Sequence, residues 1–146
     1  MEQPAADPQT TAVRVRDGMF ATDAAAHMLG MRVLSISPGH ASVAMTVRAD
    51  MLNGFGSCQG GLIATLADMA FAYACNSYNE FTVASGFDVD LLAPARTGDE
   101  LTARAGVVSQ AGRLGLYDVD VRNQADERVA VFRGRSYRIK GKPVVP

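Results

Sequence analysis

The chain has 146 residues, the usual length of one domain, and its 14 Lys/Arg and 15 Asp/Glu residues leave a net charge of −1. A chain this close to neutral, with 7% aromatic residues, does not fit a dedicated nucleic-acid binder, which needs a basic excess. Two His and two Cys leave little for a structural zinc site, because such a site takes four of these ligands and would need every one of them.

The two cysteines, Cys58 and Cys75, form no CxxC pair, so we expect free thiols in a reducing compartment. The first residues have neither the basic region nor the apolar region of a signal peptide. The apolar stretch from Met69 to Cys75 is too short to span a bilayer. The sequence therefore predicts a cytoplasmic protein that does not enter a membrane.

The first elements are predicted from prolines, caps and turns. Residues 1–17 are expected to form a flexible tail, because prolines and small polar residues dominate its start. A short helix is expected over residues 23–28, with Asp23 as its N-cap and Gly30 at its end. A strand pair is expected around the turn at residues 37–40.

The middle of the chain predicts a loop followed by a long helix. Residues 53–57 have loop composition, and residues 60–75 are rich in Ala, Leu and Met. Apolar positions cover nearly the whole helix circumference, which indicates a buried helix. After Phe81, period-two alternation predicts strands around residues 87–91, 101–107, 117–121 and 128–139. We expect an α+β domain in which a curved antiparallel sheet wraps around a long central helix, at about residues 59–76.

Asp68 is the only charged residue of this helix, and none of its neighbours three or four positions away is cationic. Burial of an unpaired carboxylate is costly, which favours a desolvated group with a raised pKa, suited to act as general base or nucleophile. In the alternative interpretation, a distant arginine pairs with Asp68, or its carboxylate reaches solvent.

Gly60 and Gly61 open the same helix. Their backbone N–H groups could polarise a carbonyl and hold an oxyanion, although such a pair is often only a turn. Eight residues separate Gly60 from Asp68, about 12 Å along a helix axis. If both groups act on one carbonyl, they come from two copies of the chain, so we expect a homodimer with composite sites.

Other catalytic patterns are missing or incomplete. The sequence has no Gly-x-Ser-x-Gly elbow and no phosphate-binding Walker A run, and Gln59 interrupts a GxGxxG match. Cys58 could be activated by the helix N-terminus, but no His partner is obvious.

Charge is divided along the chain. Residues 1–127 carry 8 basic and 15 acidic side chains, whereas residues 128–146 carry six basic and no acidic ones. This terminal segment is interpreted as a charged, solvated edge strand. Alternatively, some of its arginines, together with Arg113, bind the phosphates of a nucleotide-bearing ligand.

Several motifs together resemble the hotdog-fold acyl-CoA thioesterases of the phenylacetic-acid-degradation type. The matching segments cover roughly residues 18–139 and include Met51-Leu52-Asn53-Gly54, Ser57-Cys58-Gln59-Gly60-Gly61, Leu66-Ala67-Asp68, Asp90-Leu91-Leu92-Ala93-Pro94 and Phe132-Arg133-Gly134-Arg135-Ser136. The resemblance implies a single hotdog domain, at residues 18–142, with a C-terminal tail at residues 143–146. It also implies hydrolysis of aromatic acyl-CoA thioesters without a metal or cofactor, coenzyme A being part of the substrate, in a homodimer that assembles into a homotetramer.

The resemblance also assigns roles. Asp68 is the general base or nucleophile, the N–H of Gly60 polarises the thioester carbonyl, and Asn53 orients water or the acyl group. Gln59 stands where the family usually has His, and it cannot carry a proton. The candidate substrate-binding residues are Gly61, Ser85, Phe55, Arg113 and Arg135. Because of Gln59, a second hypothesis is a non-catalytic protein that binds or senses acyl-CoA. A third hypothesis, a hotdog dehydratase or hydratase, ranks last, because these enzymes generally rely on a catalytic His and neither His27 nor His40 lies near the Asp68 helix in sequence.

Overall fold

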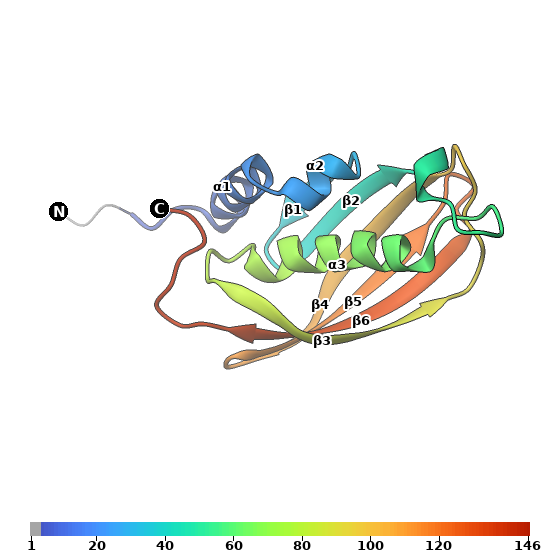
Figure 1. The fold of residues 1–146 in the computed structure, drawn as a ribbon. Helices are drawn as coiled ribbons and strands as arrows, with labels where there is room; N and C mark the ends of the chain where they lie inside the picture. The colour runs from blue at the N-terminus through green and yellow to red at the C-terminus, as the bar shows by residue number, and fades with distance from the viewer. Residues whose placement is uncertain (1–3) are drawn as a thin grey trace.

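A six-stranded antiparallel sheet curves around one long helix in the computed structural model, which describes residues 4–146 (Figure 1). The helices are α1 (Pro8–Ala21), α2 (Ala24–Met28), the single 3-10 turn η1 (Ala49–Met51) and α3 (Gly60–Asn76). The strands are β1 (Arg32–Ser37), β2 (His40–Thr46), β3 (Thr82–Leu91), β4 (Glu100–Ala111), β5 (Leu114–Arg122) and β6 (Arg128–Arg138). Their order in the sheet is β1-β2-β4-β5-β6-β3, which confirms the predicted α+β architecture.

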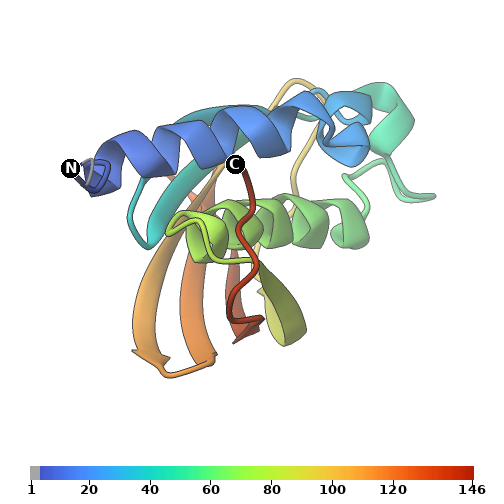
Figure 2. The same ribbon diagram turned by 90° about the vertical axis from the view of Figure 1, so that its left-hand side faces the viewer.

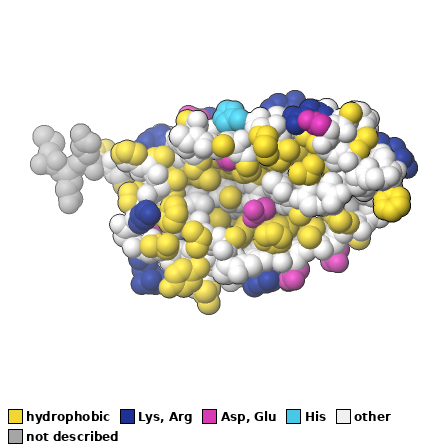
Figure 3. Space-filling model, viewed as in Figure 1, with side chains coloured by type: hydrophobic (Ala, Val, Ile, Leu, Met, Phe, Trp, Pro, Cys, Tyr) yellow, Lys and Arg dark blue, Asp and Glu magenta, His cyan; other side chains and the backbone are white. Residues whose placement is uncertain are grey.

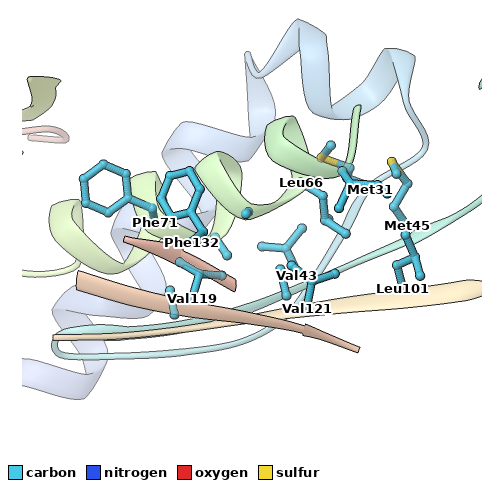
Figure 4. Packing of buried hydrophobic residues seen from close by; sticks show 14 of the residues in the cluster. Met31, Val43, Met45, Leu66, Phe71, Leu101, Val119, Val121 and Phe132 are labelled. Atoms are coloured by element: carbon cyan, nitrogen blue, oxygen red, sulfur yellow. The ribbon is translucent and has the colours of Figure 1, made fainter. Parts of the chain in front are cut away.

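One side of α3 forms the centre of the core. Leu66 and Phe71 are buried against Val43, Leu101 and other inward side chains of the sheet, as Figure 4 shows. The opposite side of α3 remains accessible, because Gly61 is exposed and several residues along the same side are only half-buried. The prediction of a helix buried all round is therefore wrong for this one face.

Strand β3 forms an edge of the sheet. Its inward-facing residues Phe87 and Leu91 remain 42% and 51% exposed, although Phe87 stacks on the buried Phe132 of β6. Helix α3 packs on β2, β4 and β5 more than on β3, so this edge is left uncovered. The prediction that residues 128–139 form an edge strand is also wrong, because β6 lies between β5 and β3.

The N-terminal segment was predicted to be a tail, of which residues 1–3 lie outside the residues that the structure describes. Residues 8–17, predicted to be tail, form most of α1, which packs on β1 and α3 (Figure 2). Pro8 occupies the first turn, where a missing N–H is tolerated, and Asp7 caps it by accepting from the Thr10 N–H at 3.1 Å. Ala12 and Val15 of α1 are fully buried, and this packing against the rest of the domain explains why residues 8–17 are helical.

The C-terminal segment is also held in place, contrary to the expected tail at residues 143–146. The Asn79 side chain accepts hydrogen bonds from the N–H groups of Val144 and Val145 and donates one to the Val145 carbonyl. Figures 1 and 2 both show this end of the chain beside α1.

Helix α2 begins as predicted, with Asp23 as its N-cap. The Asp23 carboxylate accepts from the Ala26 N–H and also from the hydroxyl of Tyr73, a fully buried residue of α3, at 3.0 Å. This contact joins the short helix to the central helix, and Gly30, with φ of +66°, ends the segment as expected.

Candidate active site

The loop before α3 is organised by Asn53. Its side-chain oxygen accepts hydrogen bonds from the N–H groups of Phe55 (2.8 Å) and Ser57 (3.3 Å), and its amide donates to the Ser57 hydroxyl (3.2 Å). Such local bonds are typical of Asn in turns. Within one chain, Asn53 therefore holds the loop that leads to the helix.

Gly60 and Gly61 begin α3 with backbone N–H groups that have no acceptor elsewhere in residues 4–146. The helix dipole adds positive potential at this end, where an oxyanion would be stabilised. Leu91 on β3 lies against Gly60, and a Cβ at position 60 would require the end of the Leu91 side chain to move.

A shallow cavity of about 290 Å³ lies at this end of α3. The predicted residues Asn53 and Gly60 line it together, which brings two of the candidate groups to one place. Polar and apolar groups share its walls, and the other lining residues are Ser57, Cys58, Ile63, Leu91, Leu92, Ala93 and Pro94. Residues 90–94 are one of the segments that resemble the thioesterase family, but no role was predicted for them. That resemblance is the signal in the sequence that this segment borders the site.

Cys58 and Gln59 directly precede α3, and the first is buried whereas the second is exposed. The Gln59 carbonyl accepts from Leu62 and Ile63, but its exposed side chain bonds to no group in residues 4–146. Cys58 is 4% exposed, and burial raises the pKa of its thiol. A protonated, buried thiol does not suit the role of a nucleophile.

Asp68 lies on the accessible side of α3 and is half-buried. Desolvation raises the pKa of its carboxyl group, and no cation within residues 4–146 forms a salt bridge with it. The distant arginine of the alternative interpretation is therefore not found in this part of the chain. Figure 3 shows this side of the molecule, where hydrophobic side chains gather along the region of α3 and most charged ones lie at the margins.

Asp68 does not line the cavity that contains Asn53 and Gly60. Helix α3 is continuous from Gly60 to Asn76, so about 12 Å of helix axis separates the Asp68 and Gly60 backbones. The two central catalytic candidates are thus not brought together within one chain.

The predicted substrate-binding residues are also dispersed. Gly61 is at the α3 N-terminus, and Phe55, 97% exposed, projects from the preceding loop. The Ser85 hydroxyl donates to the Arg135 carbonyl at 3.2 Å, between β3 and β6. Arg113 is in the β4–β5 turn, and Figure 1 shows this turn at the opposite end of the sheet from the loop that precedes α3.

The arginines of β6 bind carboxylates of neighbouring segments. Arg133 forms two hydrogen bonds with Asp118, at 2.7 and 2.9 Å, and lowers the pKa of that carboxyl group. The other pairs are Arg128 with Asp120, Arg135 with Asp88 and Arg138 with Glu80. These pairings favour a solvated charged surface over a phosphate site on β6.

Two further observations concern metals and membranes. Within residues 4–146, no three His, Cys, Asp or Glu side chains are grouped to hold a metal ion. No helix in the same range is long and apolar enough to cross a membrane.

Comparison with known proteins places the chain in a family. Residues 55–130 match the Thioesterase superfamily. The chain is 50% identical over 123 residues to the acyl-coenzyme A thioesterase PaaI of Escherichia coli, covering 84% of this chain and 88% of that protein.

Solved structures agree with this assignment. The E. coli PaaI protein from the phenylacetic acid degradation operon superposes with a TM-score of 0.91 at 46% identity, over 93% of this chain and 99% of that one. The smu.793 protein of Streptococcus mutans, bound to acetyl CoA, superposes with a TM-score of 0.74 at 25% identity, over 77% and 90% of the chains. The chain therefore belongs to the thioesterase superfamily and has its hotdog fold.

Proposed function

We propose that the protein hydrolyses acyl-CoA thioesters to the free acid and CoA, with phenylacetyl-type aromatic acyl groups as substrates. The observation that carries the proposal is the pair of unbonded N–H groups at the α3 N-terminus, where Gly60 lines a cavity with both polar and apolar walls. The 50% identity to an acyl-CoA thioesterase supports the reaction, and the acetyl CoA in the Streptococcus relative supports the ligand class.

In the proposed mechanism, Asp68 removes a proton from water as the water oxygen attacks the thioester carbonyl. The Gly60 N–H stabilises the resulting oxyanion, which collapses by breaking the C–S bond. The CoA thiolate leaves and takes up the proton. A desolvated carboxylate with a raised pKa is a stronger base than an ordinary aspartate, which fits this role.

We further propose that each site is shared between two chains of a homodimer. The separation of Asp68 from the Gly60 cavity supports this assembly. The uncovered β3 edge, with Phe87 and Leu91 half-exposed, supplies an apolar and hydrogen-bonding surface for a second copy. We also propose that two such dimers form a homotetramer, and that the protein acts in the cytoplasm without a cofactor.

The activity is tested with an acyl-CoA panel and a thiol-release readout, using wild type, Asp68→Asn and the matched control Asp17→Asn. Asp17 is an exposed residue of α1, so its variant is expected to match wild type. Loss of a general base lowers kcat by about 10²–10⁴-fold. Equal turnover by wild type and Asp68→Asn would refute the role of Asp68. Tight binding without turnover by wild type would instead support the acyl-CoA binding protein.

The composite site is tested by co-expression of two inactive chains, Asp68→Asn and Gly60→Val. A heterodimer of these chains has one doubly impaired site and one intact site if residues come from both chains. Random pairing then restores roughly a quarter of wild-type turnover. Sites contained within one chain would give no recovery, and that result would remove the shared site while leaving the reaction open.

A further inference from the structure

The side chain of Leu91, the last residue of β3, lies directly against the start of α3. A Cβ at Gly60 would touch Cδ1 of Leu91, and Cγ and Cδ2 of the same leucine lie 3.8 and 4.0 Å from that point. Glycine at position 60 thus leaves the space that the end of the leucine occupies. The branched end of Leu91 therefore stands beside the N–H group that binds the thioester carbonyl in the proposed mechanism.

Leu91 and Gly60 both line the cavity of about 290 Å³ at this end of α3. Leu91 is half-exposed, so its side chain is accessible to a ligand. Ile63, which lines the same cavity three residues further along the helix, is buried and belongs to the core. Leu92 is as exposed as Leu91, yet the three atoms nearest to the Cβ position of Gly60 all belong to Leu91. Leu91 is thus the accessible apolar side chain next to the carbonyl-binding group.

The backbone that carries Leu91 is held in place on both sides of the cavity. The N–H of Leu92 donates to the Val129 carbonyl, which joins the end of β3 to β6 at 2.8 Å. The N–H of Cys58 donates to the Ala95 carbonyl, also at 2.8 Å, and ties the loop before α3 to the segment after β3. A ligand that needs more room at the helix start must therefore displace the Leu91 side chain, because the backbone around it is bonded.

The geometry of a bound thioester brings its acyl group to Leu91. A carbonyl oxygen held by the Gly60 N–H lies about 2.9 Å from that nitrogen, and the atoms two bonds beyond the oxygen lie within roughly 5.5 Å of it. These atoms are the thioester sulfur and the α-carbon of the acyl group. The sulfur is common to all CoA thioesters, so the α-carbon is the position near Leu91 at which substrates differ.

We infer that Leu91 is a specificity-determining residue, whose side chain admits acyl groups with an unbranched α-carbon and excludes those with a branch there. The inference rests on the proposed function and narrows its substrate class to thioesters that carry a CH2 group next to the carbonyl. Bulk at the far end of the acyl group lies beyond the reach of Leu91, so the selection is for position and not for size alone.

The test compares three thioesters that differ by one methyl group. Phenylacetyl-CoA is unbranched, 2-phenylpropanoyl-CoA has an added methyl on the α-carbon, and its isomer (4-methylphenyl)acetyl-CoA has the same methyl at the far end of the ring. One methyl group in a pocket changes kcat/KM by about 10–200-fold. We therefore expect Leu91→Ala to raise the kcat/KM ratio of 2-phenylpropanoyl-CoA to phenylacetyl-CoA at least about tenfold, and the ratio of the isomer to phenylacetyl-CoA less than about threefold.

Two further variants complete the series. Leu91→Val removes less of the side chain, so a smaller rise in the same direction is expected, and it retains the test if Leu91→Ala does not fold. Leu34→Ala, which shortens an exposed leucine of β1 outside this cavity, is the matched control and is expected to leave both ratios unchanged. Leu91 also belongs to the β3 edge proposed to bind a second copy, so its replacement can reduce the fraction of assembled protein. That fraction multiplies both kcat/KM values of one preparation and cancels in their ratio.

An unchanged ratio for 2-phenylpropanoyl-CoA in both Leu91 variants would overturn the inference, and so would an equal rise for the two methyl isomers. If wild type hydrolyses none of the three thioesters, the proposed reaction is refuted. The intact thioesters then serve as ligands in isothermal titration calorimetry. In that case Leu91→Ala is expected to strengthen the binding of 2-phenylpropanoyl-CoA relative to phenylacetyl-CoA by about tenfold, and an unchanged ratio of dissociation constants would overturn the inference as well.

Discussion

The contact between Gly134 and Phe71 allows a stability prediction with a defined magnitude. A Cβ at position 134 of β6 would lie 2.8–2.9 Å from three ring atoms of Phe71, roughly half an ångström inside ordinary contact distance. The ring cannot easily move away, because Phe71 is 1% exposed and packs on Tyr117 and Phe132 at centroid distances of 5.5 and 5.9 Å. Overpacking of this kind costs about 1–3 kcal/mol, so we expect Gly134→Ala to destabilise the protein by about that amount.

A double-mutant cycle with Phe71→Leu isolates this contact. The smaller side chain alone loses about 1–2 kcal/mol of packing, but it makes room for the new methyl group. We therefore expect the free energy of unfolding of the double variant to be about 1–2 kcal/mol higher than the value obtained by adding the two single effects. Urea unfolding at one fixed protein concentration measures each variant, with Gly54→Ala as control because nothing lies within 4 Å of its added Cβ. Additivity within about 0.5 kcal/mol would refute the steric argument.

Three further predictions concern the site. Because the pKa of Asp68 is raised in the folded state, protonation stabilises the fold at low pH, and that stability is lost as pH rises through the folded pKa. Asp68→Asn is thus expected to have a higher free energy of unfolding than wild type at pH 7, by an amount that shrinks as the pH falls toward the ordinary range of aspartate, and a variant less stable than wild type at pH 7 would contradict desolvation. Gln59→His is expected to leave urea stability within about 0.5 kcal/mol, since the Gln59 side chain is exposed and bonds to no group in residues 4–146. In turnover, it adds a pH dependence near the His pKa only if that position takes part in proton transfer. Burial raises the thiol pKa of Cys58, and raises that of Cys75 to about 12, so a thiol reagent at pH 8 is expected to label neither thiol in the folded protein and both in urea. Fast labelling of the native protein would show that one of the two sites opens.

Elements that depend on local patterns were predictable. The period-two strands, the Asp23 cap and the Gly60 start of the central helix are encoded by neighbouring residues, and the structure confirms them. The formation of helix α1 was not predictable in this way, because it depends on burial of Ala12 and Val15 against elements far along the chain. Sheet order is equally non-local, so the position of β6 between β5 and β3 required the structure.

For the candidate site as well, local features were predictable from the sequence and contacts between distant segments were not. The polar groups were predictable, because a lone acid on an apolar helix and a Gly pair at its start are unusual in composition. The contact of Leu91 with Gly60 was not predictable, since it joins β3 to the start of α3. Asn53 was expected to orient water or the acyl group, whereas within one chain its side-chain oxygen accepts hydrogen bonds from two backbone N–H groups.

The two sides of α3 explain why the same helix supplies both the core and the candidate site. Small residues such as Ala67 and Ala70 let the helix approach the sheet closely, so the large inward side chains Leu66 and Phe71 are fully buried. That burial fixes the rotation of the helix and leaves Asp68 on the accessible side, where no cation of residues 4–146 neutralises it. A carboxylate kept there reduces stability, and a second copy at the β3 edge would desolvate it further. The composite dimer therefore predicts that association raises the pKa of Asp68 above its value in the single chain, which an NMR titration of the Asp68 carboxyl group above and below the dimer dissociation constant would detect.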